Sequence, residues 1–88
     1  MEFEWDERKR RANLEKHGLD FIDAELVFLG EHLTVASSYS REERWLTIGR
    51  LDQRAVAVVW TSRAGAIRII SFRRARHEER RAFGALHE

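Results

Sequence analysis

The first thirty residues contain a largely polar stretch followed by a largely apolar one, and both predict α-helices. Residues 6–16 predict a largely polar helix, with Asp6 as its N-cap and Gly18 just beyond its end. Residues 21–29 predict a second helix, whose apolar side chains form a broad face. The second helix is therefore expected to contribute more to the core than the first.

After residue 30 the pattern changes to the alternation typical of β-strands. The predicted strands are residues 32–37, 44–51, 54–62 and 66–72. A polar loop is predicted over residues 38–43. Residues 76–86 predict a closing helix with acidic residues in its first turn, where the helix dipole favours them.

This order of two helices, four strands and one helix indicates an α+β fold. Short connections between the strands predict a four-stranded, mainly antiparallel sheet with helices on one face. The other face would remain open, and an open sheet face is a place where a small domain can hold a site.

Length and composition exclude several classes of protein. Eighty-eight residues are enough for one domain, residues 1–88, but not for a cofactor domain beside a substrate domain. The absence of cysteine excludes disulfides, a thiolate nucleophile and cysteine-ligated metals. No apolar run approaches the ~20 residues of a membrane span, and the first residues are acidic where a secretory signal is basic. We therefore expect a cytoplasmic protein with no cofactor and no membrane partner.

The net charge is only +1, but the basic residues are concentrated toward the C-terminus. Fourteen of the sixteen basic residues are arginine, whose planar fork suits phosphate and carboxylate. This distribution favours a nucleic acid or an acidic protein as partner. A solvated surface of ion pairs explains it equally well.

An ordered set of short motifs resembles the BrnT-type toxins of type II toxin–antitoxin systems. The motifs are Phe3-Glu4-Trp5-Asp6, Asn13, Lys16-His17-Gly18, Phe21, Val27-Phe28, Glu43-Arg44, Thr47-Ile48-Gly49-Arg50, Arg68-Ile69-Ile70-Ser71, Arg73-Arg74-Ala75 and Glu79-Arg80-Arg81. Two positions depart from the family pattern. Phe72 stands where a small residue is expected, and Phe83 stands where the family often has tyrosine, which leaves Phe83 to packing.

The resemblance implies a RelE-like fold and a ribonuclease toxin that acts on RNA. It also implies a cognate BrnA-type antitoxin, which neutralises the toxin and carries the DNA-binding domain, so that promoter DNA is bound only through the antitoxin. The antitoxin is expected to cover the arginine face, or an apolar patch that includes Ile70 and Phe72.

Arg68 is the first candidate for the site. Strand alternation places Arg68 on one face with Ile70 and Phe72, and Ile67 and Ile69 on the other. If the isoleucines face the helices, Arg68 projects onto the open face and can bind a phosphate through two hydrogen bonds. The alternative is an ion pair across neighbouring strands.

Arg44 and Arg50 lie on one face of their predicted strand, as candidates for catalysis and RNA binding respectively. Glu43 is a candidate base, held ionised by a neighbouring arginine. Glu43 is equally a candidate for an ordinary surface salt bridge.

Four more residues complete the predicted site. If the strand continues, Arg74 shares the face of Arg68, whereas Arg73 would contact RNA or the antitoxin. Lys16 and His17 end the first helix, where positive charge offsets the helix dipole. His17 is also a candidate proton carrier, because imidazole titrates near neutral pH. Lys16 is a candidate RNA contact. The other histidines show no metal-ligand spacing, so no metal site is predicted.

Three hypotheses therefore remain. The first is a metal-independent endoribonuclease with Arg68, Arg44, Arg74, Glu43 and His17 in catalysis and Arg50, Arg73 and Lys16 on the RNA. The second is a binding module without catalysis. The third is a structural partner whose arginine face meets an acidic chain.

Overall fold

The computed structural model describes residues 1–37 and 42–87 of the chain. In chain order the elements are β1 (Phe3–Glu4), α1 (Glu7–His17), the 3₁₀ turn η1 (Phe21–Asp23), α2 (Ala24–Leu29), β2 (His32–Ser37), β3 (Arg44–Leu51), β4 (Arg54–Arg63), β5 (Ala66–Arg74) and α3 (His77–His87). Residues 38–41 of the predicted loop over residues 38–43 lie outside the described part of the chain. Within the described ranges, no helix is long and apolar enough to cross a membrane.

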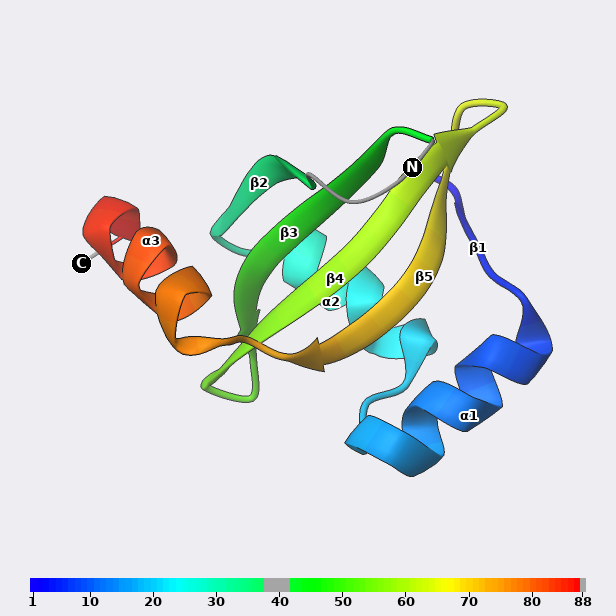
Figure 1. Cartoon of the computed structure of the whole chain (residues 1–88), viewed down its shortest axis with the longest axis horizontal. Coiled ribbons are helices and arrows are strands. Elements are labelled where there is room, and N and C mark those ends of the chain that lie inside the picture. The colour runs from blue at the N-terminus through cyan, green and yellow to red at the C-terminus, as the bar shows by residue number, and fades with distance from the viewer. Residues whose placement is uncertain (38–41, 88) are drawn as a thin grey trace.

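The strands form one sheet in the order β1-β5-β4-β3-β2 (Figure 1). Strands β2 to β5 pair antiparallel, as predicted, whereas β1 pairs with β5 in parallel. The sheet therefore has five strands and is mixed, so the prediction of four strands was wrong. A strand of two residues is too short to show an alternation in the sequence.

The ends of the first helix follow the predicted local signals. The Asp6 carboxylate accepts hydrogen bonds from the backbone N–H groups of Arg8 and Lys9. Gly18 takes φ 71°, a left-handed conformation that glycine adopts without steric cost. The second predicted helix is split into η1 and α2, and Asp20 accepts from the Ile22 N–H at its start.

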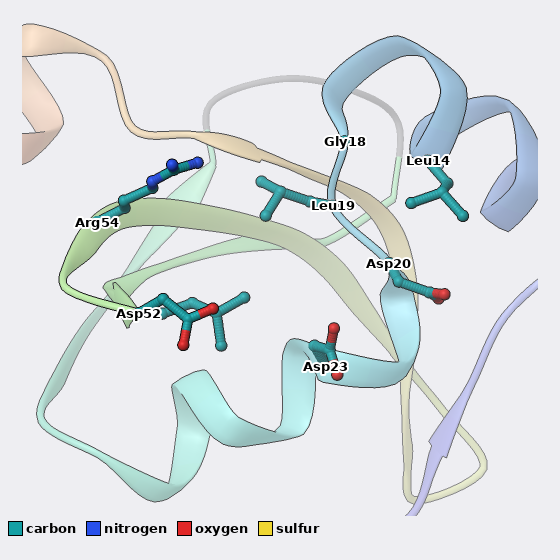
Figure 2. A pocket seen from close by; sticks show the side chains of 8 residues that line it. Leu14, Gly18, Leu19, Asp20, Asp23, Asp52 and Arg54 are labelled. Atoms are coloured by element: carbon teal, nitrogen blue, oxygen red, sulfur yellow. The ribbon is translucent and has the colours of Figure 1, made fainter.

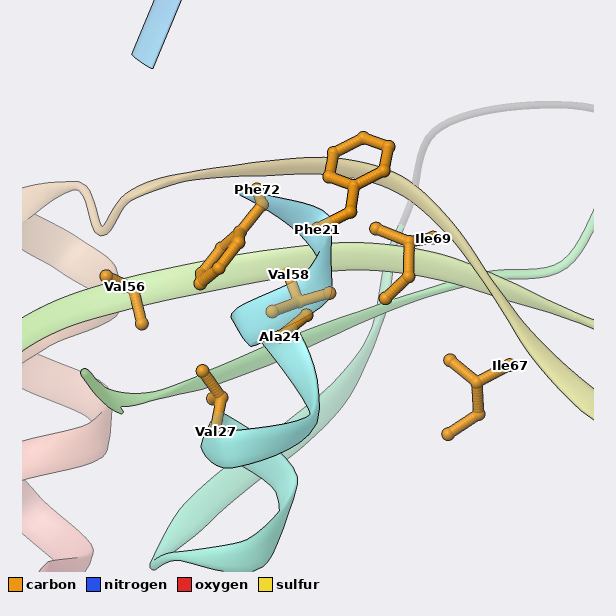
Figure 3. Close-up of a cluster of buried hydrophobic side chains, with 8 residues drawn as sticks. All are labelled: Phe21, Ala24, Val27, Val56, Val58, Ile67, Ile69 and Phe72. Carbon is orange, nitrogen blue, oxygen red and sulfur yellow. The ribbon is translucent and has the colours of Figure 1, made fainter. Parts of the chain in front are cut away.

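The main core fills the space between η1, α2 and one face of the sheet (Figure 3). Its buried residues are Phe21, Ala24, Val27, Val56, Val58, Ile67, Ile69 and Phe72. We call this side of the sheet the helical face, since η1 and α2 cover it (Figure 3).

A smaller cluster lies on the opposite side of the sheet. There Phe83 of α3 is buried against Ile48 and Ala75, with Leu33 and Leu46 packed around them. The prediction that all helices share one face was therefore wrong, because α3 covers part of the second face. The packing role predicted for Phe83 is confirmed.

A β-bulge at Ile70 changes which side chains of β5 share a face. Ser71 pairs with Val59 while Ile69 pairs with Trp60, so Ile70 is an extra residue without a partner on β4. Phe72 consequently joins Ile67 and Ile69 on the helical face, where it is fully buried. The prediction that Phe72 lies beside Arg68, or in a surface patch, was wrong.

Asn13 of α1 takes the place of a neighbouring strand beyond the end of β1. Its side-chain amide donates to the Phe72 carbonyl at 2.7 Å and accepts from the Phe72 N–H at 3.1 Å. It also donates to the Leu19 carbonyl at 3.0 Å. This buried side chain thereby joins α1 and the following loop to the outer edge of β5.

Candidate functional site

A groove of about 640 Å³ lies on the second face of the sheet, beside the start of α3. Its apolar part is formed by Leu46, Val59 and Ile70, and its polar part by Arg44, Ser71, Arg73, Arg76 and Glu79. Strand alternation brings the residues of β3, β4 and β5 to this face. Among the described residues, the groove therefore combines three arginines and one carboxylate with a partly apolar floor.

A pair of hydrogen bonds in the groove joins Arg73 and Glu79. The guanidinium of Arg73 donates from Nη1 to Oε1 at 2.8 Å and from Nη2 to Oε2 at 2.9 Å. Both side chains are largely buried, with 16% and 14% of their surface exposed. Two parallel bonds fix the plane of the guanidinium as well as its position.

Glu79 also connects the groove to α3. Its Oε1 accepts from the backbone N–H of Arg76 at 2.7 Å, as a glutamate in a first helical turn commonly does. The hydrogen bond from Arg73 is the main cause that lowers the pKa of Glu79, and the Arg76 N–H and both positive charges act in the same direction. Burial opposes this effect but does not outweigh it, so Glu79 is ionised at neutral pH.

Arg44 enters the groove from the start of β3. Its Nε donates to Oε1 of Glu42 at 3.2 Å, and about a quarter of the side chain is exposed. The partner of Arg44 is thus Glu42 and not the Glu43 of the sequence prediction. The side chain of Glu43 is exposed, and its backbone carbonyl accepts from Oγ1 of Thr61 at 2.7 Å.

Arg68 lies on the second face of the sheet, as predicted, but it does not line the groove. Its Nη1 donates to Oε2 of Glu4 at 2.8 Å, across the parallel pair of β1 and β5. The alternative of a cross-strand ion pair therefore describes its observed contact. A role for Arg68 in binding RNA stays a prediction.

Arg73 and Arg74 occupy the opposite positions from those predicted. The bulge at Ile70 reverses the alternation, so Arg73 shares the face of Arg68 and reaches the groove. Arg74 pairs with Val56 on the helical face, where its side chain is exposed. The prediction that Arg74 joins Arg68 was wrong, since it assumed an uninterrupted strand.

The remaining predicted residues lie away from the groove. The guanidinium of Arg50 stands over the Phe83 ring, 4.8 Å from its centre. Lys16 and His17 end α1, whose Asn13 side chain bonds to the outer edge of β5. Partial burial, followed by the positive charges of Lys16 and Arg73, lowers the pKa of His17. None of these three residues lines the groove.

The sequence prediction missed Glu79 and Arg76. Arg76 precedes α3 and Glu79 is the third residue of that helix. A glutamate at this position is a recognisable capping pattern. That pattern predicts the bond to Arg76, whereas the bond from Arg73 depends on the bulge and has no local signal.

A second hollow, of about 350 Å³, opens on the helical face (Figure 2). Asp20, Asp23 and Asp52 line it together with Arg54, and Asp20 is also bonded by Nη1 of Arg10 at 3.1 Å. Nowhere in the described ranges are three or more histidines or carboxylates placed to hold a metal ion. The two hollows thus differ in charge: the groove is mainly basic and the second hollow mainly acidic.

Comparison with known proteins identifies the family. The model of the family described as "Ribonuclease toxin, BrnT, of type II toxin-antitoxin system" matches residues 5–79, a range that contains every residue lining the groove. No curated protein matches the chain. Because the match covers most of its length, the chain belongs to the BrnT family of ribonuclease toxins of type II toxin–antitoxin systems.

Proposed function

We propose that this toxin is a metal-independent endoribonuclease of RelE-like type, and that it cleaves RNA bound in the groove of the second face. The observation that carries the proposal is the convergence of Arg44, Arg73 and Arg76 on one groove in a chain of this family. Arginine is suited to this task because it stays protonated and can form two parallel bonds to a phosphate.

The proposed reaction uses the substrate's own 2′-hydroxyl. Its oxygen attacks the adjacent phosphorus, the bond from phosphorus to the 5′-oxygen breaks, and the products are a 2′,3′-cyclic phosphate and a 5′-hydroxyl. The attacking hydroxyl loses a proton and the leaving oxygen gains one. Negative charge accumulates on the phosphate oxygens in between, where the three guanidiniums of the groove can stabilise it. Preorganised charge of this kind is usually the largest contribution to catalysis.

Glu79 has two parts in this proposal. It positions Arg73 through the paired hydrogen bonds, and among the groove-lining residues it is the carboxylate able to accept the proton of the 2′-hydroxyl. A substrate phosphate that accepts the two hydrogen bonds of the Arg73 guanidinium would displace Glu79 from them. Glu79 would then be available to accept the proton of the 2′-hydroxyl. A neutral glutamine at position 79 keeps the shape of the side chain but cannot accept that proton, so Glu79→Gln is expected to cleave slowly.

The reaction is tested with a 5′-labelled RNA in EDTA beside an all-deoxy copy, separated on a denaturing gel. Cleavage of the RNA alone is expected, because DNA lacks the attacking 2′-hydroxyl. Equal cleavage of both strands would refute the mechanism. Intact RNA with a salt-sensitive mobility shift would instead support a binding module.

Adjacent arginines give the matched control for the site. Arg73→Ala is expected to lower the cleavage rate about 100-fold or more, the usual effect of removing one donor to the developing charge. Arg74→Ala removes the same side chain one residue further along, on the other face of the sheet. Equal loss in both variants, with circular dichroism spectra like that of the parent, would place the chemistry outside the groove. Arg44→Ala provides a second test that leaves the Arg73–Glu79 pair in place.

We also propose that the protein acts in the cytoplasm and is neutralised by a BrnA-type antitoxin through which it reaches promoter DNA. Family membership supports an antitoxin partner. Co-purification with the product of an adjacent reading frame tests this partner directly.

A further inference from the structure

We propose that the outer surface of η1 and α2 is the docking site of the antitoxin, and that it receives a basic, amphipathic segment of that protein. The inference rests on the antitoxin partner of the proposed function. It does not depend on how, or whether, the groove cleaves RNA.

The segment from η1 to α2 is apolar on both of its sides. Phe21, Ala24 and Val27 face the sheet and are buried in the main core (Figure 3). On the outer side Ile22, Leu26 and Leu29 are 58%, 53% and 75% exposed. We call these three residues the outer stripe. Large apolar side chains that cluster on an exposed surface indicate a missing partner.

The outer stripe holds most of the strongly exposed large apolar residues of the described chain. Leu26 and Leu29 follow Ile22 by four and seven residues, a spacing that places side chains on one side of a helix. In the described part of the chain, five large hydrophobic residues are more than half exposed, and three of them form the stripe. Scattered apolar residues need no explanation, whereas a cluster of this kind marks an interaction surface.

The charge around the stripe indicates what kind of partner fits. Residues 18–31 contain Asp20, Asp23, Glu25 and Glu31 and no basic residue, although the whole chain has a net charge of +1. Asp23 and Glu25 are exposed beside the stripe, and Asp23 also lines the acidic hollow that contains Asp52 (Figure 2). Apolar residues bordered by carboxylates match a segment whose apolar side is bordered by lysine or arginine.

The same charges disfavour a second copy of this chain as the occupant. In a two-fold dimer the same patch of both subunits meets, so the stripe of one copy would meet the stripe of the other. Carboxylates at both borders would then approach carboxylates, which costs binding energy. The antitoxin, which the family supplies as a partner of different sequence, has no such restriction.

The position of the stripe separates docking from catalysis, and it replaces the expectation that the antitoxin covers the arginine face or a patch with Ile70. The stripe lies on the helical side of the sheet, and the arginine groove lies on the opposite side. Substitutions in the stripe should therefore release the toxin from its antitoxin and leave the groove intact.

The test compares Leu26→Glu/Leu29→Glu with Leu86→Glu, a matched control at an α3 leucine that is 63% exposed and lies outside the stripe. The probe is the antitoxin encoded beside the toxin gene, and its dissociation constant is measured by calorimetry with each purified toxin. We expect the stripe variant to bind about 10-fold more weakly or worse, since a few buried apolar anchors dominate most interfaces. We expect the control to bind like the parent, and all three toxins to give the same circular dichroism spectrum.

A second variant tests the charge argument. Asp23→Lys/Glu25→Lys leaves the stripe apolar but reverses the charge at its borders. It should weaken antitoxin binding and remove much of its dependence on salt concentration. Unchanged affinity and unchanged salt dependence would refute the choice of a basic segment.

The remaining outcomes are each decisive. Unchanged affinity of the stripe variant, or an equal loss in the Leu86 control, would overturn the docking site. So would a parent dimer that dissociates in the stripe variant without a change in antitoxin affinity, because the stripe would then hold a second copy. No binding of the adjacent product to the parent would refute partner and site together. Stripe-dependent binding by a parent that does not cleave RNA would instead support the docking site and refute the proposed enzyme activity.

Discussion

Asn13 offers the sharpest test of how the fold is stabilised. Its buried amide makes three hydrogen bonds to backbone groups, two of them with Phe72 and one with Leu19. Phe72 is itself fully buried, so water has little access to its N–H and carbonyl groups. Asn13→Ala removes every partner that the side chain supplies, and it leaves these backbone groups in place.

The expected loss of stability can be worked out from these contacts. A hydrogen bond contributes about 0.5–1.5 kcal/mol, and a buried group left without a partner costs about 1–3 kcal/mol. Relaxation around the small alanine side chain recovers part of this, so we expect the free energy of unfolding to fall by about 2–4 kcal/mol. Small domains are stable by only about 5–15 kcal/mol, so this one substitution would remove a large part of the total.

The measurement is urea unfolding followed by circular dichroism and tryptophan fluorescence. Glu15→Ala is the matched control, an exposed position two residues away on α1, and it should change stability by less than about 0.5 kcal/mol. Asn13→Asp gives a second test. Its carboxylate can still accept from the Phe72 N–H, but at neutral pH it cannot donate to the two carbonyls. It should therefore be unstable at pH 7 and recover as acidification protonates the carboxyl group.

A loss below about 0.5 kcal/mol for Asn13→Ala would refute this reasoning. It would mean that water or a shift of α1 satisfies the backbone of β5 equally well. An Asn13→Asp variant that loses more stability on acidification than the parent does would contradict the assignment of the amide as donor to the carbonyls.

Three further predictions concern packing and pH. A Cβ atom on Gly49 would lie 2.8 Å from Cγ1 of Val27, so Gly49→Ala should destabilise the fold by about 1–3 kcal/mol; an unchanged melting temperature would contradict this. The folded-state pKa of Glu79 lies below its ordinary value of 4.5, so its contribution is full above pH 4.5 and is lost as the pH falls through the lowered pKa. Glu79→Gln should therefore be less stable at pH 7 and lose less stability on acidification, as followed by urea unfolding at a series of pH values. The folded-state pKa of His17 lies below 6.5, so the unfolded chain binds a proton at this residue first as the pH falls. Stability should therefore fall as the pH drops below 6.5. His17→Gln should lack this part of the pH dependence when unfolding is measured at the same series of pH values.

Local signals in the sequence were sufficient for most of the helix and strand positions. Asp6 and Gly18 delimit α1, because capping depends on residues within a few positions of each other. The alternation of β3 and β4 likewise predicts their bounds within one residue. These features needed no knowledge of distant contacts.

The candidate site was predicted less well, because it depends on contacts between distant elements. Strand β1 has two residues and exists only because β5 offers an edge for it. The pairing of Arg68 with Glu4 joins residues 64 positions apart, and neither residue shows it locally. The prediction of Arg74 for the groove followed correctly from alternation, but alternation does not predict where a strand contains an extra residue.

The bulge at Ile70 therefore determines which arginine reaches the groove. Without it, regular alternation would turn Arg74 toward the groove and Arg73 toward the helical face. Glu79 would then lose the guanidinium that fixes the start of α3 against the sheet. Deletion of Ile70 would in addition turn Phe72 out of the core, so the same residue controls the core on one face and the arginine groove on the other. The chain has a net charge of only +1 but still presents a basic groove, because its charges are separated between the two faces. The bulge places Arg73 on the face with the groove, whereas the acidic residues of η1 and α2 lie on the opposite side of the sheet.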